Sequence, residues 1–77
     1  MKKTIVFLHT VASLAAMFDK LAKDAFGADA EIMHLVDEML LKDVLRNGGL
    51  TTFEYQRVSD HAVAVERFGA DILQLTC

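Results

Sequence analysis

Short apolar runs alternate with amphipathic stretches along the chain. Residues 3–8 form a nearly continuous apolar run rich in β-branched and aromatic side chains, and residues 31–36 and 71–77 form two similar runs. Runs of this length are typical of strands in a parallel sheet that is covered on both faces. We therefore predict three strands at these positions.

A long amphipathic helix is predicted between the first two strands. From residue 11 to residue 26 apolar side chains recur at steps of three and four, which marks one face of an α-helix. Gly27 follows at the place of a C-cap, where a positive φ is often needed. Thr10 or Ser13 is predicted to cap the start, because a side-chain oxygen there can accept a free backbone N–H.

Two further helices are predicted between the second and third strands. Residues 39–46 form a short one, with Asp37 and Glu38 at its start, and the Asn-Gly-Gly run at 47–49 ends it. The second covers residues 51–68, and the spacing of Thr51 and Glu54 is that of a capping box. Its apolar side chains at steps of three and four are predicted to form the buried stripe: Tyr55, Val58, Ala62, Val65 and Phe68.

Alternation of strands and helices predicts an α/β fold with a three-stranded parallel sheet in the order 2-1-3 and flanking helices. The 77 residues form one domain at most. A domain of this size buries only about 60% of its unfolded surface, whereas 53% of its residues are hydrophobic. We therefore expect some apolar side chains to pack against a second copy of the chain or against the rest of a longer protein.

Charge and cysteine content exclude several classes of function. The net charge is −3 and there is no basic stripe, so nucleic-acid binding is not expected. The apolar runs are shorter than the roughly 20 residues of a membrane span. One cysteine cannot form an internal disulfide, which fits a reducing cytoplasm. The three histidines are far apart in sequence and form no metal-ligand spacing, so no metal site is expected.

The first residues also fit a second interpretation. Lys2 and Lys3 precede an apolar run, and small residues follow it, as in a secretory signal peptide. However, His9 and Thr10 interrupt the apolar run after only five residues. The strand interpretation is therefore favoured.

Candidate functional residues lie at the ends of the predicted strands. In open α/β sheets, ligands bind beyond the carboxyl ends of the strands. His9, Thr10 and Ser13 follow the first strand, and Thr76 and Cys77 end the third. With the first strand in the centre, these two segments are neighbours. Hydroxyl and N–H groups of residues 9–13 could bind a carboxylate, although the same residues also suit a helix cap and a polar strand end.

The remaining polar residues are interpreted as structural. Asp37 and Glu38 are adjacent, so they cannot face each other as a catalytic pair, and we interpret them as caps of the short helix. His34 lies inside the second strand and His61 inside the last helix. Both are interpreted as structural or surface histidines rather than as ligands.

Three segments resemble the aspartate/glutamate/hydantoin racemase superfamily: FLHTVASL at 7–14, HLVDEMLLKDVLRNGGLT at 34–51, and GADILQLTC at 69–77. Together with the strands and helices between them, the resemblance covers essentially the whole chain. It implies a protein of two similar α/β lobes with the active site between them. It also implies a cofactor-independent racemase or isomerase. In this family each lobe classically supplies a cysteine, and the two act as thiolate base and thiol acid on opposite faces of the substrate's α-carbon.

By this resemblance, Cys77 is the catalytic cysteine of the first lobe. His9, Thr10, Ser13 and Thr76 would bind a small carboxylate-bearing substrate: an amino acid, a hydantoin or a malonate-type diacid. A free thiol has a pKa of about 8.5, and a helix N-terminus facing it would favour the thiolate. The resemblance implies that residues 1–77 are the N-terminal part of a two-lobe enzyme, cut at its first catalytic cysteine and inactive alone.

Other interpretations remain open. Residues 1–77 could form a non-catalytic, truncated α/β domain that self-associates into a homo-oligomer, with the free edge of the third strand pairing with another copy. Cys77 could then be a buried or terminal thiol without a role. A flavodoxin-like or nucleotide-binding half-domain is disfavoured, because no Gly-rich phosphate loop follows the first strand.

Overall fold

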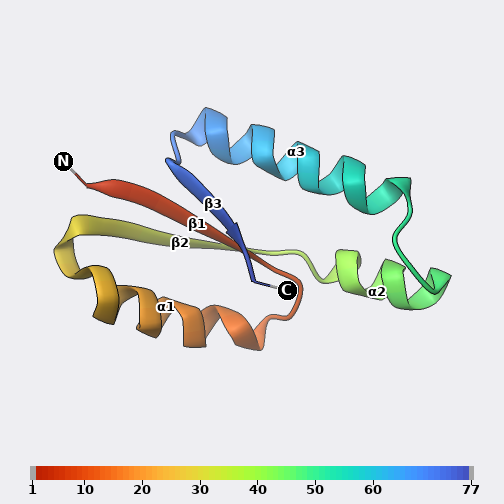
Figure 1. Cartoon of the computed structure of the whole chain (residues 1–77), viewed down its shortest axis with the longest axis horizontal. Coiled ribbons are helices and arrows are strands. Elements are labelled where there is room, and N and C mark those ends of the chain that lie inside the picture. Colours follow the sequence, from red (N-terminus) through yellow and green to blue (C-terminus); the bar gives the residue numbers. More distant parts are fainter. Residues whose placement is uncertain (1, 77) are drawn as a thin grey trace.

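The computed structural model describes residues 2–76 and contains one three-stranded parallel sheet with helices on both sides (Figure 1). Strand β1 (Lys3–His9) lies in the centre, between β2 (Ala30–Val36) and β3 (Ile72–Leu75). The sheet order β2-β1-β3 confirms the predicted α/β fold and its strand order. The third strand is shorter than predicted, and Cys77 lies outside the described residues.

The register brings the carboxyl ends of the strands to one edge of the sheet. β1 pairs with β2 from Lys3 to His9 and with β3 from Ile5 to Leu8. Two backbone bonds continue these ladders, because the N–H of Asp37 donates to His9 O at 2.8 Å and the N–H of Thr76 to Leu8 O at 3.1 Å. The residues that follow β1, β2 and β3 are therefore neighbours.

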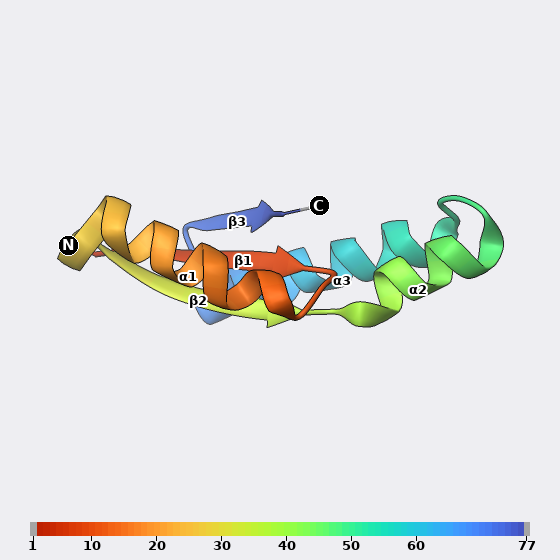
Figure 2. The same ribbon diagram turned by 90° about the horizontal axis from the view of Figure 1, so that it is seen from below.

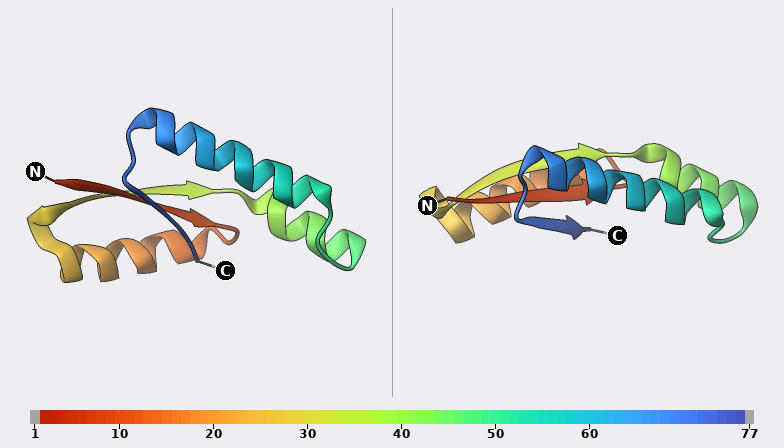
Figure 3. Two further views of the ribbon diagram at one scale, coloured as in Figure 1. Left: turned by 45° about the horizontal axis from the view of Figure 1, so that its top comes forward. Right: turned by 90° about the horizontal axis from the view of Figure 1, so that it is seen from above.

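The helices lie on opposite sides of the sheet. Helix α1 (Ser13–Phe26) and a short 3-10 turn, η1 (Gly27–Asp29), connect β1 to β2, and α1 packs against both strands. Helices α2 (Glu38–Asn47) and α3 (Thr52–Phe68) contact each other, and α3 runs along the other side of the strands (Figures 1 and 2). Helix α2 extends past the carboxyl ends of the strands (Figure 3). Within residues 2–76, no helix has the length and apolarity needed to cross a membrane.

The core forms around the central strand. Side chains alternate across a strand, and Ile5 and Phe7 of β1 pack on the α1 side against Ala22 and Phe18. Leu8 points to the other side, toward α2 and α3, where it lines a cavity. Burial of both faces explains why the β1 sequence is continuously apolar.

The start of α1 differs from the prediction. Its N-cap is Ala12, and no side chain caps it, so the prediction that Thr10 or Ser13 caps this helix was wrong. The chain instead begins the helix with backbone bonds, from Leu14 N–H to Val11 O at 3.1 Å and from Ala15 N–H to Ala12 O at 3.2 Å. Backbone acceptors have thus replaced the side-chain cap.

The buried face of α3 agrees with the prediction only in part, because Val58 and Val65 are half-buried whereas Ala62 is exposed. Tyr55 is 67% exposed and Phe68 is 62% exposed, so the predicted apolar stripe was wrong at both ends of the helix. The residues turned inward include Glu54 and His61. Both make polar contacts in this position, Glu54 with the N-cap residue Thr51 and His61 with Asp37. The first contact is local to the start of α3, whereas the second turns the His61 side of α3 toward the β2–α2 corner.

Candidate functional site

Two stacked histidines connect Thr76 to the half-buried Asp19 of α1. Thr76 Oγ1 lies 2.8 Å from His9 Nδ1, and His9 Nε2 lies 2.8 Å from His34 Nδ1. His34 Nε2 lies 2.9 Å from the carboxylate of Asp19, which also pairs with Lys23 at 2.8 Å. The His9 side chain has 0% exposure. We call Thr76, His9, His34 and Asp19 the histidine relay.

Aromatic packing holds the two imidazole rings in place. The ring centroids of His9 and His34 are 5.0 Å apart at an interplanar angle of 20°. Phe7 stacks on His34, its register partner in β2, at 5.6 Å, and Phe18 of α1 contacts the His9 ring at 5.8 Å. The rings therefore have little freedom to leave the hydrogen-bonded geometry.

The charges of the relay follow from its surroundings. Burial lowers the pKa of His9, because it disfavours the charged imidazole, and the neighbouring His34 lowers it further. The hydrogen bond from Lys23 lowers the pKa of Asp19, and the bond from His34 adds to this effect. Asp19 is therefore an anionic hydrogen-bond acceptor at neutral pH.

An apolar cavity opens on the other face of the sheet at the same edge. It has a volume of about 470 Å³ and lies between the ends of β1 and β3 and the helices α2 and α3. Thr10 and Leu75 belong to its wall, so it adjoins both the turn after β1 and the residue before Thr76. Its lining side chains are mostly aliphatic: Leu8, Val11, Leu40, Leu41, Val44, Leu50, Val58 and Leu75.

Glu54 is the acidic residue of the cavity wall. Its Oε1 accepts the N–H of Thr51 at 2.7 Å, which completes the predicted capping box of α3. Its Oε2 is buried without a hydrogen-bond partner among residues 2–76. One carboxylate oxygen of Glu54 is therefore hydrogen-bonded, whereas the other is left without a partner among the described residues.

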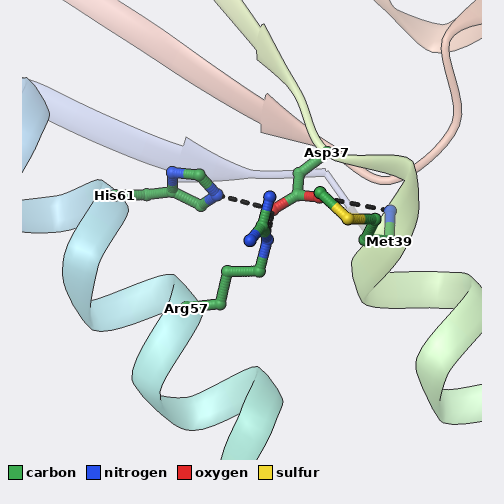
Figure 4. Close-up of polar contacts among 4 residues, drawn as sticks. All are labelled: Asp37, Met39, Arg57 and His61. Atoms are coloured by element: carbon green, nitrogen blue, oxygen red, sulfur yellow. Dashed lines mark hydrogen bonds and ion pairs between the residues drawn. The ribbon is translucent and has the colours of Figure 1, made fainter.

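Asp37 anchors a second polar cluster (Figure 4). Its side chain is 3% exposed, and its Oδ1 accepts the N–H of Met39 at 3.2 Å, as expected of a cap of α2. Its Oδ2 is 2.6 Å from His61 Nε2 and also pairs with Arg57 Nε. Burial raises the pKa of Asp37, but the bonds and charges of His61 and Arg57 outweigh burial, so the pKa is lowered. Oδ1 therefore caps α2, whereas Oδ2 joins α3 to the β2–α2 corner.

The predicted site residues occupy different environments. His9 and Thr76 bind each other, although the buried His9 can act on a ligand only through its neighbours. Thr10 is half-buried in the cavity wall, and Ser13 is exposed at the start of α1. Cys77 lies outside the described residues. Among residues 2–76, no group of three or more His, Cys, Asp or Glu side chains is arranged to hold a metal ion.

Sequence reasoning missed the roles of His34 and Asp19. Two signals were available. His34 falls on the same face of its strand as the apolar Ile32, and Asp19 interrupts α1 directly beside Phe18. A polar residue on or beside a buried face needs a hydrogen-bonding partner. The two residues satisfy each other, although they are 15 positions apart.

Comparison of the chain with models of protein families, with curated proteins and with solved structures finds no match in any of the three.

Proposed function

We propose that residues 1–77 form the first part of a cofactor-independent racemase or isomerase that transfers a proton next to a carboxylate or carbonyl. The main support is the bond between Thr76 and His9. It joins the residue before Cys77 to the end of the central strand, at the edge where open α/β sheets bind ligands. The α/β fold with strand order β2-β1-β3 agrees with the lobe that the family resemblance implies.

In this proposal the two ends of the substrate bind to two different surfaces, one polar and one apolar. The carboxylate would lie near Thr76 and the turn of Thr10 and Ser13, and an apolar substituent would enter the 470 Å³ cavity. Hydroxyl groups suit the first task because they donate charge-assisted hydrogen bonds to a carboxylate. Aliphatic side chains suit the second because they release water from an apolar group.

Cys77 would carry the proton transfer. As a thiolate it takes the proton from the α-carbon, and the electron pair left behind is delocalised into the adjacent carboxylate or carbonyl. An acid on the opposite face, from a second lobe, returns a proton to the carbon. The reaction needs no net oxidation and no cofactor, and a single reactive thiol is consistent with a reducing compartment such as the cytoplasm.

A substitution of Cys77 tests this proposal. In the longer protein that contains residues 1–77, Cys77→Ser should slow α-proton exchange at least about 100-fold, the usual contribution of general acid–base catalysis. Exchange is measured in D₂O by mass spectrometry with phenylalanine and with 5-benzylhydantoin, which both carry an apolar substituent. Ser59→Ala, at an exposed position of α3, is the control. Equal exchange in Cys77→Ser and the wild type would refute the role of Cys77.

A second candidate is a non-catalytic α/β domain that self-associates. The supporting observation is strand β3, which lies at the edge of the sheet while Ile72 is 48% exposed and Leu75 is 46% exposed. An apolar edge strand with unpaired backbone groups favours pairing with another chain.

A further inference from the structure

A continuous series of hydrogen bonds crosses the α1 side of the sheet. It starts at Asp19, passes through both nitrogens of His34 and both nitrogens of His9, and ends at Thr76 Oγ1. Each ring nitrogen therefore has one partner within the histidine relay. A proton gained or lost at either ring has to rearrange the other bonds as well.

When both histidines are neutral, Asp19 determines which group donates and which accepts in each hydrogen bond of the histidine relay. A carboxylate only accepts hydrogen bonds, so His34 must carry a proton on Nε2. Neutral His34 then accepts at Nδ1 from His9 Nε2–H, and neutral His9 accepts at Nδ1 from the Thr76 hydroxyl. The Thr76 proton points inward in this state, and only oxygen lone pairs are left for a ligand.

One added proton reverses the donor and acceptor roles along the series of hydrogen bonds. His34 with protons on both nitrogens donates to His9 Nε2, and His9 then donates from Nδ1 to Thr76 Oγ1. The Thr76 hydroxyl proton must turn to another acceptor. Leu8 O, at 3.4 Å, is a poor one, whereas a ligand carboxylate could accept a short, charge-assisted bond.

We propose that Asp19, His34 and His9 are positioning residues that make Thr76 a hydrogen-bond donor to the substrate carboxylate only when the histidine pair holds a proton. This inference rests on the carboxylate site proposed above. It predicts that carboxylate binding takes up one proton and weakens as the pH rises above the midpoint of the pair.

Other charged groups among residues 2–76 lie on the elements next to the histidine pair. On α1, Lys23 is bound to Asp19. At the β2–α2 corner, Asp37 binds His9 O through its backbone N–H, and its carboxylate is paired with Arg57 and His61 of α3. None of these other side chains is bonded to a ring nitrogen of the pair, so they act on it through longer-range charge. In the Asp19 variant used below the contacts of Asp37 are unchanged, whereas Lys23 loses the charge of its partner.

The first experiment needs no ligand. The ¹⁵N NMR signals of the imidazole nitrogens are recorded against pH on the full chain. At neutral pH both His9 and His34 are expected as the Nε2–H tautomer, and on acidification both rings should shift with one common midpoint. An Nδ1–H tautomer on either ring at neutral pH, or two independent midpoints, would overturn the relay.

The second experiment measures the affinity for phenylacetate, with benzyl alcohol as the ligand control that lacks a carboxylate. In the wild type the Kd should rise by up to about tenfold per pH unit above the midpoint, as for linkage to one proton. Thr76→Val should bind weakly at each pH with a flat profile, and Thr76→Ser should restore the slope. Binding of benzyl alcohol should not depend on pH.

Asp19→Asn tests whether the direction of the hydrogen bonds controls binding, or whether Asp19 only supports the fold. The asparagine amide can donate to His34 Nε2, which permits the reversed direction without an added proton. Its Kd at pH 8 should therefore be lower than that of the wild type, and its profile should be flatter. Asp24→Asn, at an exposed position of the same helix, should keep the wild-type profile.

The outcomes distinguish the two proposals. If phenylacetate binds with the same pH dependence in the wild type and in Asp19→Asn, the relay is refuted while the carboxylate site stands. If phenylacetate does not bind at any pH, the carboxylate site is refuted. The ring tautomers and the common midpoint then decide whether the histidine relay has the stated direction.

Discussion

At the scale of single residues, His9 combines full burial with hydrogen bonds on both ring nitrogens. Burial disfavours the imidazolium, so the pKa of His9 lies below its ordinary value of 6.5 in the folded chain. In the unfolded chain the same imidazole is solvated and titrates near 6.5. The two states therefore bind different numbers of protons in a window that begins near pH 6.5 and extends downward.

We expect this difference to make the fold less stable in mild acid. Below pH 6.5 the unfolded state gains a proton on His9 that the folded state does not, so the free energy of unfolding falls with pH. The slope is at most about 1.4 kcal/mol per pH unit, the value for one proton. It ends when the pH reaches the folded pKa.

The measurement is a series of urea unfolding curves from pH 8 to about pH 2, with the His9 ring followed by NMR. A second loss of stability is expected below pH 3.8, because Asp19 and Asp37 have lowered pKa values and contribute stability only while ionised. A His9 midpoint above 6.5 in the folded chain would contradict the prediction.

At the scale of secondary-structure elements, Asp37 connects three of them. It directly follows the last residue of β2, it caps α2 by accepting the Met39 N–H, and it binds Arg57 and His61 of α3. Helix α3 contacts α2, and the polar contacts of Asp37 hold it to the corner between β2 and α2. One buried carboxylate thus ties α3 to the β2–α2 corner, in addition to the contacts between α2 and α3.

Asp37→Ala should accordingly be strongly destabilising. Loss of the helix cap costs about 1 kcal/mol, and removal of one partner from a buried ion pair costs about 3 kcal/mol or more. Urea unfolding followed by circular dichroism measures the change. Asp60→Ala removes an exposed carboxylate of α3 that binds only Gln56 among the described residues, and it should cost less than about 1 kcal/mol. Equal effects of the two substitutions would argue against the anchoring role.

At the scale of the whole molecule, residues 2–76 form a thin, elongated body. The radius of gyration is 13.4 Å and the shortest dimension is 12 Å, whereas a compact domain of this length has a radius of about 11.5 Å. Large apolar side chains such as Leu45 and Ile72 are exposed. Hydrophobic residues make up 53% of the chain, and in a body of this shape many of their side chains are exposed to water.

Self-association through β3 is therefore expected at high concentration. Ile72→Lys places a charge on the free edge strand and should weaken association by about tenfold or more, because charged side chains protect sheet edges. Sedimentation velocity over a concentration series measures it. Leu45→Lys makes the same change at an exposed position of α2, away from the sheet, and should leave association unchanged. A wild-type chain that stays monomeric throughout would exclude this interface.

The sequence by itself determined the order of elements, the parallel sheet, its strand order and the capping box of α3. These features follow from local signals: apolar runs, helical spacing, the glycines after the helices, and Thr51 three residues before Glu54. The backbone start of α1, the inward face of α3, the histidine relay and the Asp37 cluster were decided only by the tertiary structure. Each depends on side chains or backbone groups whose orientation is set by packing: His34 of β2 meets Asp19 of α1, and Asp37 after β2 meets His61 of α3. Local spacing marked His34 and Asp19 as polar residues on or beside a buried face, but it did not specify their partners, because the contacts join segments that are distant in sequence.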